Sequence, residues 1–455
     1  MPTPKPANSF QLRILPALSL LLLAVGLLLS GNPALALVAT ALRWSGLALA
    51  IPFLLARRSL LAWTFFAMVA GVIFGMDLPH AAIQTHFLGD LFLRLIRVIV
   101  APLIFATITT GIAGHNHLGG VGRVAVKALI YFEVVTTFGL LIGLLAIDIS
   151  QAGVGVAMPA VTAAAPIAPL VSEPGWQQLI LNIFPENIAL AVAQNQILQV
   201  AVFSIAFGIA LARLPEPKRE PLVRILQSLA DTMLGMTRIV MYAAPVAAGA
   251  ALAYTVGSTG VATLIPLLKL VATFYVALIV FLVAVQLPIL VWAGIPLRRF
   301  LAAVAEPTAI GFATTTSEAA LPLAMERMEA FGIPRWIVSF VIPAGYSFNM
   351  TGSSVYLSIG AVFAAQVAGI HLGVGQQLIM LATLLLTSKG VAGVPRAVLV
   401  ILLATAGSLH IPTAPILMIL GVDTLIDMGR TSMNVLGNCM ASAVVARWEG
   451  AMEKG

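Results

Sequence analysis

Long apolar runs, separated by short polar or charged segments, make up most of this chain. They predict membrane-spanning helices over 12–30, 34–55, 59–76, 91–113, 127–149, 193–213, 223–254 and 264–294. Four later apolar stretches are interrupted mid-length by polar clusters that contain Gly or Pro: 299–325, 335–366, 374–407 and 413–447. The pattern predicts an all-α polytopic membrane protein whose C-terminal third departs from plain spanning helices.

The composition of the chain limits the class of protein. Of 455 residues, 60% are hydrophobic and only 9% are charged, which is too little polar surface for a soluble protein of this length. The net charge of +7 is typical of basic cytoplasmic loops, and no basic run is dense enough to indicate a nucleic-acid partner. The single cysteine, Cys439, excludes an internal disulfide.

Lys and Arg are distributed unevenly between the connections. They gather in alternate ones, at Arg57–Arg58, Arg123 with Lys127, Arg213 to Arg224, Arg298–Arg299 and Arg447. The positive-inside rule places these connections and both termini in the cytoplasm, as in a multi-pass protein of a bacterial inner membrane. The alternation reaches the C-terminus only if 299–325 and 374–407 are re-entrant hairpins that return to their own side.

The first 55 residues have two interpretations. The apolar run ending near Ala34-Leu35-Ala36 could be a cleaved signal peptide, but an uncleaved pair of extra helices is favoured because carriers of the inner membrane rarely need cleavage. The predicted topology is the same in both cases. Arg43 lies inside the second apolar run and weakens it as a span, and the pattern offers no role for it.

The segment 423–438 places charges inside a stretch that is otherwise apolar enough to cross a bilayer. A charge at the bilayer centre costs ~2.5–3.5 kcal/mol on insertion scales, so such side chains normally face a protein interior or a water-filled cavity. Asp427 could neutralise Arg430 as a purely structural pair. A zwitterion with an extra carboxylate would satisfy both residues instead, which favours an acidic amino acid. Six polar residues of the segment share one helix face: Asp423, Asp427, Arg430, Thr431, Asn434 and Asn438.

Three polar segments interrupt the apolar arms before this helix. Residues 313–322 offer four consecutive hydroxyls, which suit either a hairpin tip that leaves amides free for an anion or a turn in water. Residues 345–353 combine Gly, Asn and small hydroxyls, as in an unwound helix whose carbonyls coordinate a cation. Residues 387–396 contain Gly and Pro that disfavour a continuous helix, although one such break could be a kink. Two broken segments, each followed by a polar-centred helix, are typical of transporters with inverted repeats.

Four motifs in this order and spacing resemble one family of carriers. They are Ser317-Glu318 with Leu321-Pro322, then Asn349-Met350-Thr351-Gly352, then Gly390-Val391-Ala392-Gly393-Val394-Pro395, then Asp427-Met428-Gly429-Arg430-Thr431 with Asn434. The chain resembles the dicarboxylate/amino acid:cation symporters, which include bacterial glutamate/aspartate carriers and the excitatory amino acid transporters. The resemblance covers about residues 59–449, and the first 55 residues lie outside it.

The resemblance implies a glutamate-transporter-like fold, a homotrimer and an elevator mechanism. It implies an N-terminal extension over 1–57, mainly trimerisation scaffold over 58–296, a transport domain over 297–449 joined by 127–149, and a cytoplasmic tail over 450–455. It also implies symport of L-glutamate or L-aspartate with a cation and no other cofactor. In this reading Arg430 holds the side-chain carboxylate and Asp427 the α-ammonium. The full set of implied substrate contacts is Arg430, Asp427, Thr431, Asn434, Ser317, Thr316, Ser353, Val391, Ala392 and Gly393.

The cation-binding residues implied by the resemblance are Gly345, Ser347, Asn349, Thr351, Ser388, Lys389, Val391, Asn434, Asn438, Thr136 and Thr137. Two of these positions depart from the family's pattern, because Thr351 and Asn438 stand where many members have sodium-binding aspartates. A hard cation thereby loses its strongest ligands. Leu357 occupies the position of the proton-carrying glutamate of animal members. The sequence therefore favours proton coupling or fewer sodium ions, with Glu133, Glu318 and Asp423 as the candidate proton carriers.

Three other readings remain open at this point. A C4-dicarboxylate carrier is the nearest alternative, although such relatives tend to lack the ammonium-binding aspartate at the position of Asp427. An anion channel would use the same pathway without concentrating its solute. An enzyme is disfavoured because all six histidines fall near predicted loops or span ends, which leaves Ser317 without a histidine base. The pattern gives no role to Arg396, at the tip of the second hairpin.

Overall fold

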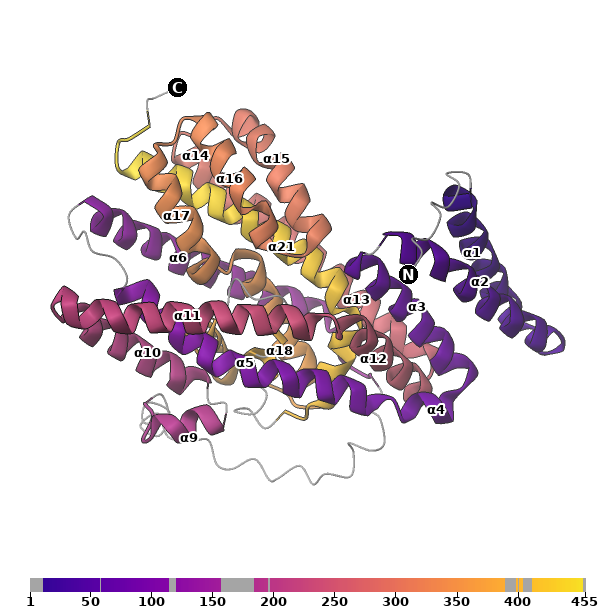
Figure 1. The fold of residues 1–455 in the computed structure, drawn as a ribbon. Helices are drawn as coiled ribbons and strands as arrows, with labels where there is room; N and C mark the ends of the chain where they lie inside the picture. Colours follow the sequence, from indigo (N-terminus) through magenta and orange to yellow (C-terminus); the bar gives the residue numbers. More distant parts are fainter. Residues whose placement is uncertain are drawn as a thin grey trace, which may run out of the picture. The chain divides into compact units, whose positions relative to one another are not determined.

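The computed structural model describes residues 11–57, 59–113, 120–156, 184–194, 197–388, 398–399, 401–403 and 411–452. These residues form helices joined by short turns (Figure 1), so the prediction of an all-α fold is confirmed. The N-terminal half contains α1 (Gln11–Leu28), α2 (Ala36–Arg57), α3 (Leu60–Asp77), α4 (Pro79–Ile83), α5 (His86–Ala113), α6 (Gly120–Ser150), α9 (Ile188–Ala193) and α10 (Ile197–Ala212). The C-terminal half contains α11 (Glu216–Met241), α12 (Ala244–Thr259), α13 (Leu264–Phe281), α14 (Leu287–Trp292), α15 (Leu297–Thr314), α16 (Ser317–Phe331), α17 (Arg335–Phe348), α18 (Thr351–Val367), α19 (Val374–Thr387) and α21 (Ala414–Trp448).

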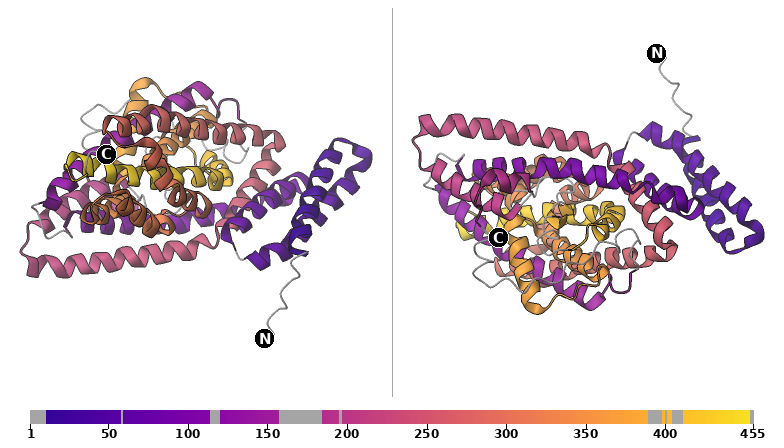
Figure 2. Two further views of the ribbon diagram at one scale, coloured as in Figure 1. Left: turned by 90° about the horizontal axis from the view of Figure 1, so that it is seen from above. Right: turned by 90° about the horizontal axis from the view of Figure 1, so that it is seen from below.

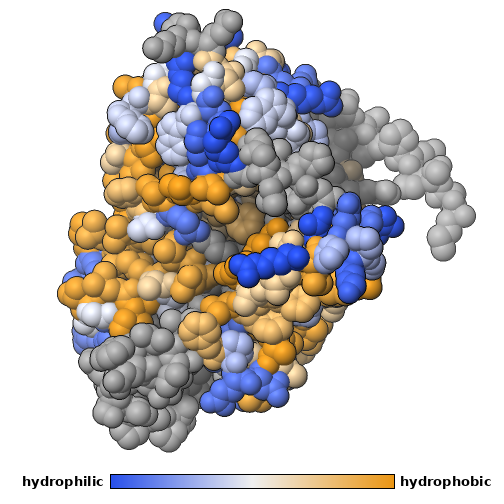
Figure 3. Space-filling view, turned by 90° about the vertical axis from the view of Figure 1, so that its left-hand side faces the viewer, coloured by the Kyte–Doolittle hydropathy of each residue, from blue (hydrophilic) through white to orange (hydrophobic). Residues whose placement is uncertain are grey.

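Several of these helices have the length and composition of membrane spans. Among the described residues, the stretches that qualify are Pro33–Ala56, Leu60–Asp77, Arg123–Ser150, Val261–Trp292 and Arg335–Val367. Large apolar side chains stay exposed along them, among them Val69, Leu145 and Ile279. The face drawn in Figure 3 is accordingly largely apolar, with hydrophilic patches between. Such a surface is stable in lipid, where the helical backbone satisfies its own hydrogen bonds.

The chain divides into two compact units, of which the first comprises Met1–Phe92 and Tyr242–Leu264. Its centre is the close packing of α3 on α12, where a Cβ on Gly71 would lie only 2.1 Å from the Gly249 carbonyl oxygen. Small residues at this contact let the two backbones approach, as in membrane helix pairs.

The apolar run 223–254, predicted as one span, is two helices in the structure. The helix α11 ends at Met241 and α12 begins at Ala244. Pro245 lies in the first turn of α12. Proline has no amide hydrogen to donate and its ring clashes with the preceding turn, so a helix ends before it and restarts with it.

The second unit comprises Leu93–Met241 and Ile265–Gly455, and α21 lies at its centre. The helices α15, α16, α17 and α18 all pack against α21 (Figure 1). The helix α6 packs along α18 through glycines, since a Cβ on Gly143 would lie 2.4 Å from the Val355 carbonyl oxygen. The α21 segment that carries the charged residues is therefore enclosed by protein.

The predicted interruptions take three different forms. The helices α15 and α16 reverse at Thr315, whose φ of 54° is left-handed, and they pack on each other. The helices α17 and α18 are separated at Asn349 and Met350. In contrast, α21 runs unbroken from Ala414 to Trp448, so the polar cluster within 413–447 interrupts its composition and not its backbone. The tip of the second predicted hairpin, 389–397, lies outside the described residues.

An ionic contact ties the C-terminal end of α21 to the start of α6. The Glu449 side chain, 3% exposed, lies 2.6 Å from Lys127 Nζ and 3.0 Å from Arg123 Nη2. Lys127 Nζ also donates to the Trp448 carbonyl oxygen at 2.7 Å. The hydrogen bond from Lys127, with the charges of Lys127 and Arg123, holds the pKa of Glu449 below its ordinary value.

This contact makes the stability of the protein fall at acidic pH. Because the pKa of Glu449 is lowered by folding, its contribution is complete above the ordinary glutamate value and is lost as the pH falls through the lowered one. We expect Glu449→Gln to lower the melting temperature most at neutral pH, with a difference from wild type that shrinks below about pH 4. Glu220→Gln, which breaks the exposed pair with Arg224, should have little effect at any pH. A difference for Glu449→Gln that is constant over this range would contradict the role of the charge.

Candidate functional site

The six polar residues predicted to share one face of the charged helix are all buried in α21. Asp423 is fully buried, and the other five are between 2% and 4% exposed. The enclosing helices supply polar side chains that meet them, chiefly from the start of α18. The site is therefore a polar interior in which each charge must find a protein partner or a bound one.

Asp427 and Arg430 form a direct ion pair within α21. Arg430 Nη2 lies 2.6 Å from Asp427 Oδ1, and the two side chains are 4% and 3% exposed. Thr431 Oγ1 donates to the same carboxylate oxygen at 3.1 Å. This is the structural pairing that the sequence left open as an alternative to substrate binding. It makes the pair neutral as a whole.

The guanidinium of Arg430 keeps unused hydrogen-bonding capacity. Its Nη1 donates to Ser353 Oγ at 3.2 Å, but its buried Nε has no hydrogen-bond partner among the described residues. An unmade hydrogen bond of this kind costs about 1–3 kcal/mol, more when the group is charged. A carboxylate that reached Nε would remove this cost.

Asn434 holds the first turn of α18 against α21. Its Oδ1 accepts from the backbone amides of Gly352 at 2.7 Å and Ser353 at 3.3 Å, and its Nδ2 donates to Ser353 Oγ at 3.0 Å. Gly352 makes this approach possible, because a Cβ there would lie 2.4 Å from the Arg430 carbonyl oxygen. Ser353 and Asn434, both expected to contact substrate, are thus joined to each other and to Arg430.

Where the sequence predicted a cation site, the described residues form a neutral hydrogen-bond chain. Thr351 Oγ1 donates to Asn349 Oδ1 at 2.6 Å, and Asn349 Nδ2 donates to Asn438 Oδ1 at 2.8 Å. Two glycines close on this chain, since a Cβ on Gly345 would lie 2.4 Å from Asn438 Oδ1 and one on Gly437 2.3 Å from Thr351 Oγ1. Two hydrogen bonds thus link three polar side chains, none of which carries a formal charge.

Asp423 takes part in a second buried contact that the sequence did not predict. Tyr356 OH donates to Asp423 Oδ1 at 2.9 Å, and both side chains are fully buried. Tyr275 of α13 likewise donates from its hydroxyl to the Leu425 carbonyl oxygen at 2.7 Å. In the sequence, Tyr356 and Tyr275 are each a tyrosine within an apolar run. Such a residue is most often part of the core, so the pattern does not mark either as functional.

The remaining predicted site residues lie in different surroundings. Thr316 and Ser317 are half-buried at the α15–α16 reversal, where the Ser317 carbonyl oxygen accepts from Tyr346 OH at 2.7 Å. Ser388 is buried and bonds within its own helix. Thr136 is buried with no hydrogen-bond partner for its hydroxyl among the described residues, whereas Thr137 is exposed. The side chains of Ser347 and Glu318 lie outside the described part of the structure, as do the residues Lys389, Val391, Ala392, Gly393 and Arg396.

A protein-family model described as the sodium:dicarboxylate symporter family matches residues 60–448 of the chain. The match includes α21 and the helices that pack against it, and it begins after α2.

Curated relatives share more than a third of their residues with this chain. One is the "Proton/glutamate-aspartate symporter" of Escherichia coli (strain K12), 38% identical over 87% of this chain and 94% of the relative. Another is the "C4-dicarboxylate transport protein" of Solibacter usitatus, 39% identical over 88% of this chain and 94% of the relative. A third is the "Proton/sodium-glutamate symport protein" of Bacillus caldotenax, 37% identical over 87% of this chain and 96% of the relative.

Hydrogen exchange can test whether Asn434 holds the first turn of α18 against α21. Asn434→Ala would leave the amides of Gly352 and Ser353 without an acceptor, at a cost of about 1–3 kcal/mol for each buried group. We expect faster exchange at the start of α18 and a lower melting temperature. Asn32→Ala is the control, because Asn32 caps an exposed turn and its loss should change little. Unchanged protection in α18 would refute the assignment.

Proposed function

Since this chain belongs to the sodium:dicarboxylate symporter family, we propose that it imports an acidic amino acid together with a cation. The names of two relatives, which include glutamate, support this substrate class. L-Aspartate and L-glutamate combine an ammonium with two carboxylates. Asp427 and Arg430 offer the complementary charges side by side in the buried interior.

The Asp427–Arg430 pair is the observation that carries this proposal. An incoming zwitterion can exchange with the pair, because its ammonium replaces Arg430 at Asp427 while its side-chain carboxylate replaces Asp427 at Arg430. Neither buried charge is left without a partner at the end of the exchange. Arg430 Nε, which has no hydrogen-bond partner in the part of the chain that the structure describes, gives the carboxylate a second donor, as in a bidentate pair.

The same exchange explains why a cation must accompany the substrate. The ligand-free pair is neutral, whereas an acidic amino acid at neutral pH brings one net negative charge into the protein interior. A buried uncompensated charge is costly, so a cation bound at the same time stabilises the loaded state. The names of the relatives support protons, sodium or both in this role.

We infer that the coupling ion here is a proton, or that fewer sodium ions are used than in sodium-driven relatives. The support is the neutral hydrogen-bonded chain of Thr351, Asn349 and Asn438, which offers no anionic oxygen to a hard cation. Asp423, one of the three candidate proton carriers, is fully buried one helical turn before Asp427. Its hydrogen bond from Tyr356 gives it a partner for its charged form.

We further propose an assembly, a motion and a membrane topology for the carrier. The carrier works as a homotrimer with an elevator motion of the transport domain, in the inner membrane of a bacterium, with both termini in the cytoplasm. Its two re-entrant hairpins are residues 299–325, within α15 and α16, and residues 374–407. Val391 to Gly393 contribute to the gate over the substrate.

Thermal stabilisation by substrate tests the role of Arg430. We expect L-aspartate or L-glutamate to raise the melting temperature of the wild type. Arg430→Ala should weaken the binding of these acidic amino acids by about 30-fold or more. Arg430→Ala leaves the buried Asp427 carboxylate without its counter-charge, which should lower the melting temperature. The double variant Asp427→Asn/Arg430→Ala should regain part of this loss but should still not be stabilised by the ligand. Arg335→Ala, at an 86% exposed side chain, is the matched control and should respond like wild type. If succinate alone stabilises the protein, the substrate is a C4-dicarboxylate; an Arg430→Ala protein that responds normally would refute the site.

Uptake into proteoliposomes tests the coupling ion. We expect a proton gradient without sodium to drive concentrative uptake of L-aspartate, because the neutral chain at Thr351 and Asn438 lacks anionic ligands. Asn438→Asp and Thr351→Asp, which restore carboxylates, should increase the response to sodium. Strong concentrative uptake that requires a sodium gradient at equal pH on both sides would overturn the proton assignment.

A further inference from the structure

The N-terminal helices α1 and α2 lie outside the family match, and they pair with each other. Both views in Figure 2 show the two indigo helices side by side. Small residues bring them close, since Ser19 Oγ donates to the Gly46 carbonyl oxygen at 2.7 Å and a Cβ on Gly26 would lie 2.8 Å from Arg43 Cγ. The pair packs through α2 on α3, the first helix of the matched region.

Arg43 is the buried charge of this pair, and each guanidinium nitrogen has a partner. Nη2 forms an ion pair with Asp77 at the end of α3, and Nε donates to the same carboxylate at 3.4 Å. Nη1 donates to the Gly26 carbonyl oxygen at 3.1 Å and to Ser30 Oγ at 2.5 Å. Thr40 Oγ1 accepts a further bond from Nη2 at 3.1 Å. The charge of α2 is thus satisfied jointly by α3 and by the end of α1.

The Asp77 carboxylate also has more than one partner. Its side chain is 7% exposed, and besides Arg43 it accepts a hydrogen bond from Trp44 Nε1 at 3.1 Å. Two consecutive residues of α2 therefore contact one carboxylate of α3. Such a contact fixes both the position and the rotation of α2 on α3.

The outer surface of the pair has the opposite character. Leu20, Leu28 and Leu37 are 68%, 81% and 88% exposed, whereas Arg43 is 5% exposed. Charge inside and leucine outside is the pattern of a helix pair surrounded by lipid, because in water the leucines would be buried and the arginine solvated.

We propose that α1 and α2 form a membrane-inserted module of the mature carrier, docked onto α3 by the Arg43–Asp77 ion pair. Asp77 is the docking site on the family fold, and Gly26 and Ser30 complete the guanidinium's set of acceptors. This assigns the role of Arg43 and decides between the two interpretations of the first 55 residues. It is independent of the substrate and of the coupling ion.

Retention of α1 follows from the same contacts. Cleavage after Ala36 would remove Gly26 and Ser30, both of which accept from Arg43 Nη1. The remaining α2 would then carry a partly unsatisfied guanidinium in hydrocarbon. The intact mass of the full-length protein, purified from membranes, tests this directly. We expect a mass that includes residues 11–36, and a chain beginning after Ala36 would overturn the proposal.

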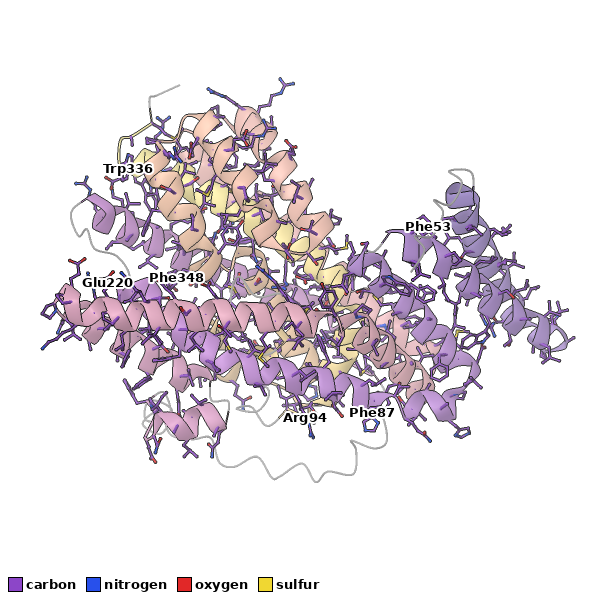
Figure 4. All side chains as sticks on the ribbon, viewed as in Figure 1. Phe53, Phe87, Arg94, Glu220, Trp336 and Phe348 are labelled. Atoms are coloured by element: carbon purple, nitrogen blue, oxygen red, sulfur yellow. The ribbon has the colours of Figure 1, made fainter. Side chains whose placement is uncertain are left out.

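A double-mutant cycle tests the docking contact. Asp77→Asn leaves Arg43 without its counter-charge, so we expect the melting temperature of the full-length carrier to fall by about 3 °C or more. Arg43→Met keeps the aliphatic stem and removes the charge, and Arg43→Met/Asp77→Asn should regain more than half of the loss. Glu220→Gln is the control, because Glu220 (labelled in Figure 4) pairs with Arg224 at the exposed surface of α11 and should cause almost no shift. Independent, additive effects of the two substitutions, or no effect of Asp77→Asn, would overturn the docking role.

Discussion

The buried ion pair of Asp427 and Arg430 is the constraint on which the transport unit depends. Two charges that are at most 4% exposed must remain neutralised at every stage, because either one alone would be costly in this environment. The surrounding helices meet this demand locally. Thr431 supports the carboxylate and Ser353 the guanidinium, while Asn434 fixes the first turn of α18 that presents Ser353. The pair is therefore a structural element of this unit, and in the proposed mechanism it is also the group that a substrate of matching charge opens.

Electroneutrality also connects substrate choice with ion coupling. Under the proposed exchange, a ligand that replaces both partners of the pair and adds a carboxylate makes the interior negatively charged, and a bound cation compensates that charge. The polar chain through Thr351, Asn349 and Asn438 is neutral and is linked by two hydrogen bonds. In the proposed mechanism, protonation of a buried carboxyl group such as Asp423 supplies the extra positive charge. The Arg43–Asp77 contact in the first unit is a second case of a buried charge with a counter-charge. Here the arginine of one helix is neutralised by the carboxylate of another helix of the same chain.

The sequence predicted what depends on local pattern. Apolar runs gave most of the helices, three- and four-residue spacing placed Asp427 and Arg430 on one face, and Asn349 marked the break between α17 and α18. It could not predict partners between helices, because periodicity defines a face and not what packs on it. Asp77 is 34 residues from Arg43, and Tyr356 is 67 from Asp423. The separation of α11 from α12 was missed for another reason. The apolar run is continuous through Pro245, so hydrophobicity alone predicted one span where the proline starts a new helix.

A structure of the carrier with bound L-aspartate, determined by electron cryomicroscopy, tests the central claim most directly. The account predicts that the direct contact between Asp427 and Arg430 is replaced, with the ligand ammonium on the Asp427 carboxylate and the ligand side-chain carboxylate on the Arg430 guanidinium. A ligand bound elsewhere, with the contact of 2.6 Å between Asp427 and Arg430 retained, would contradict it.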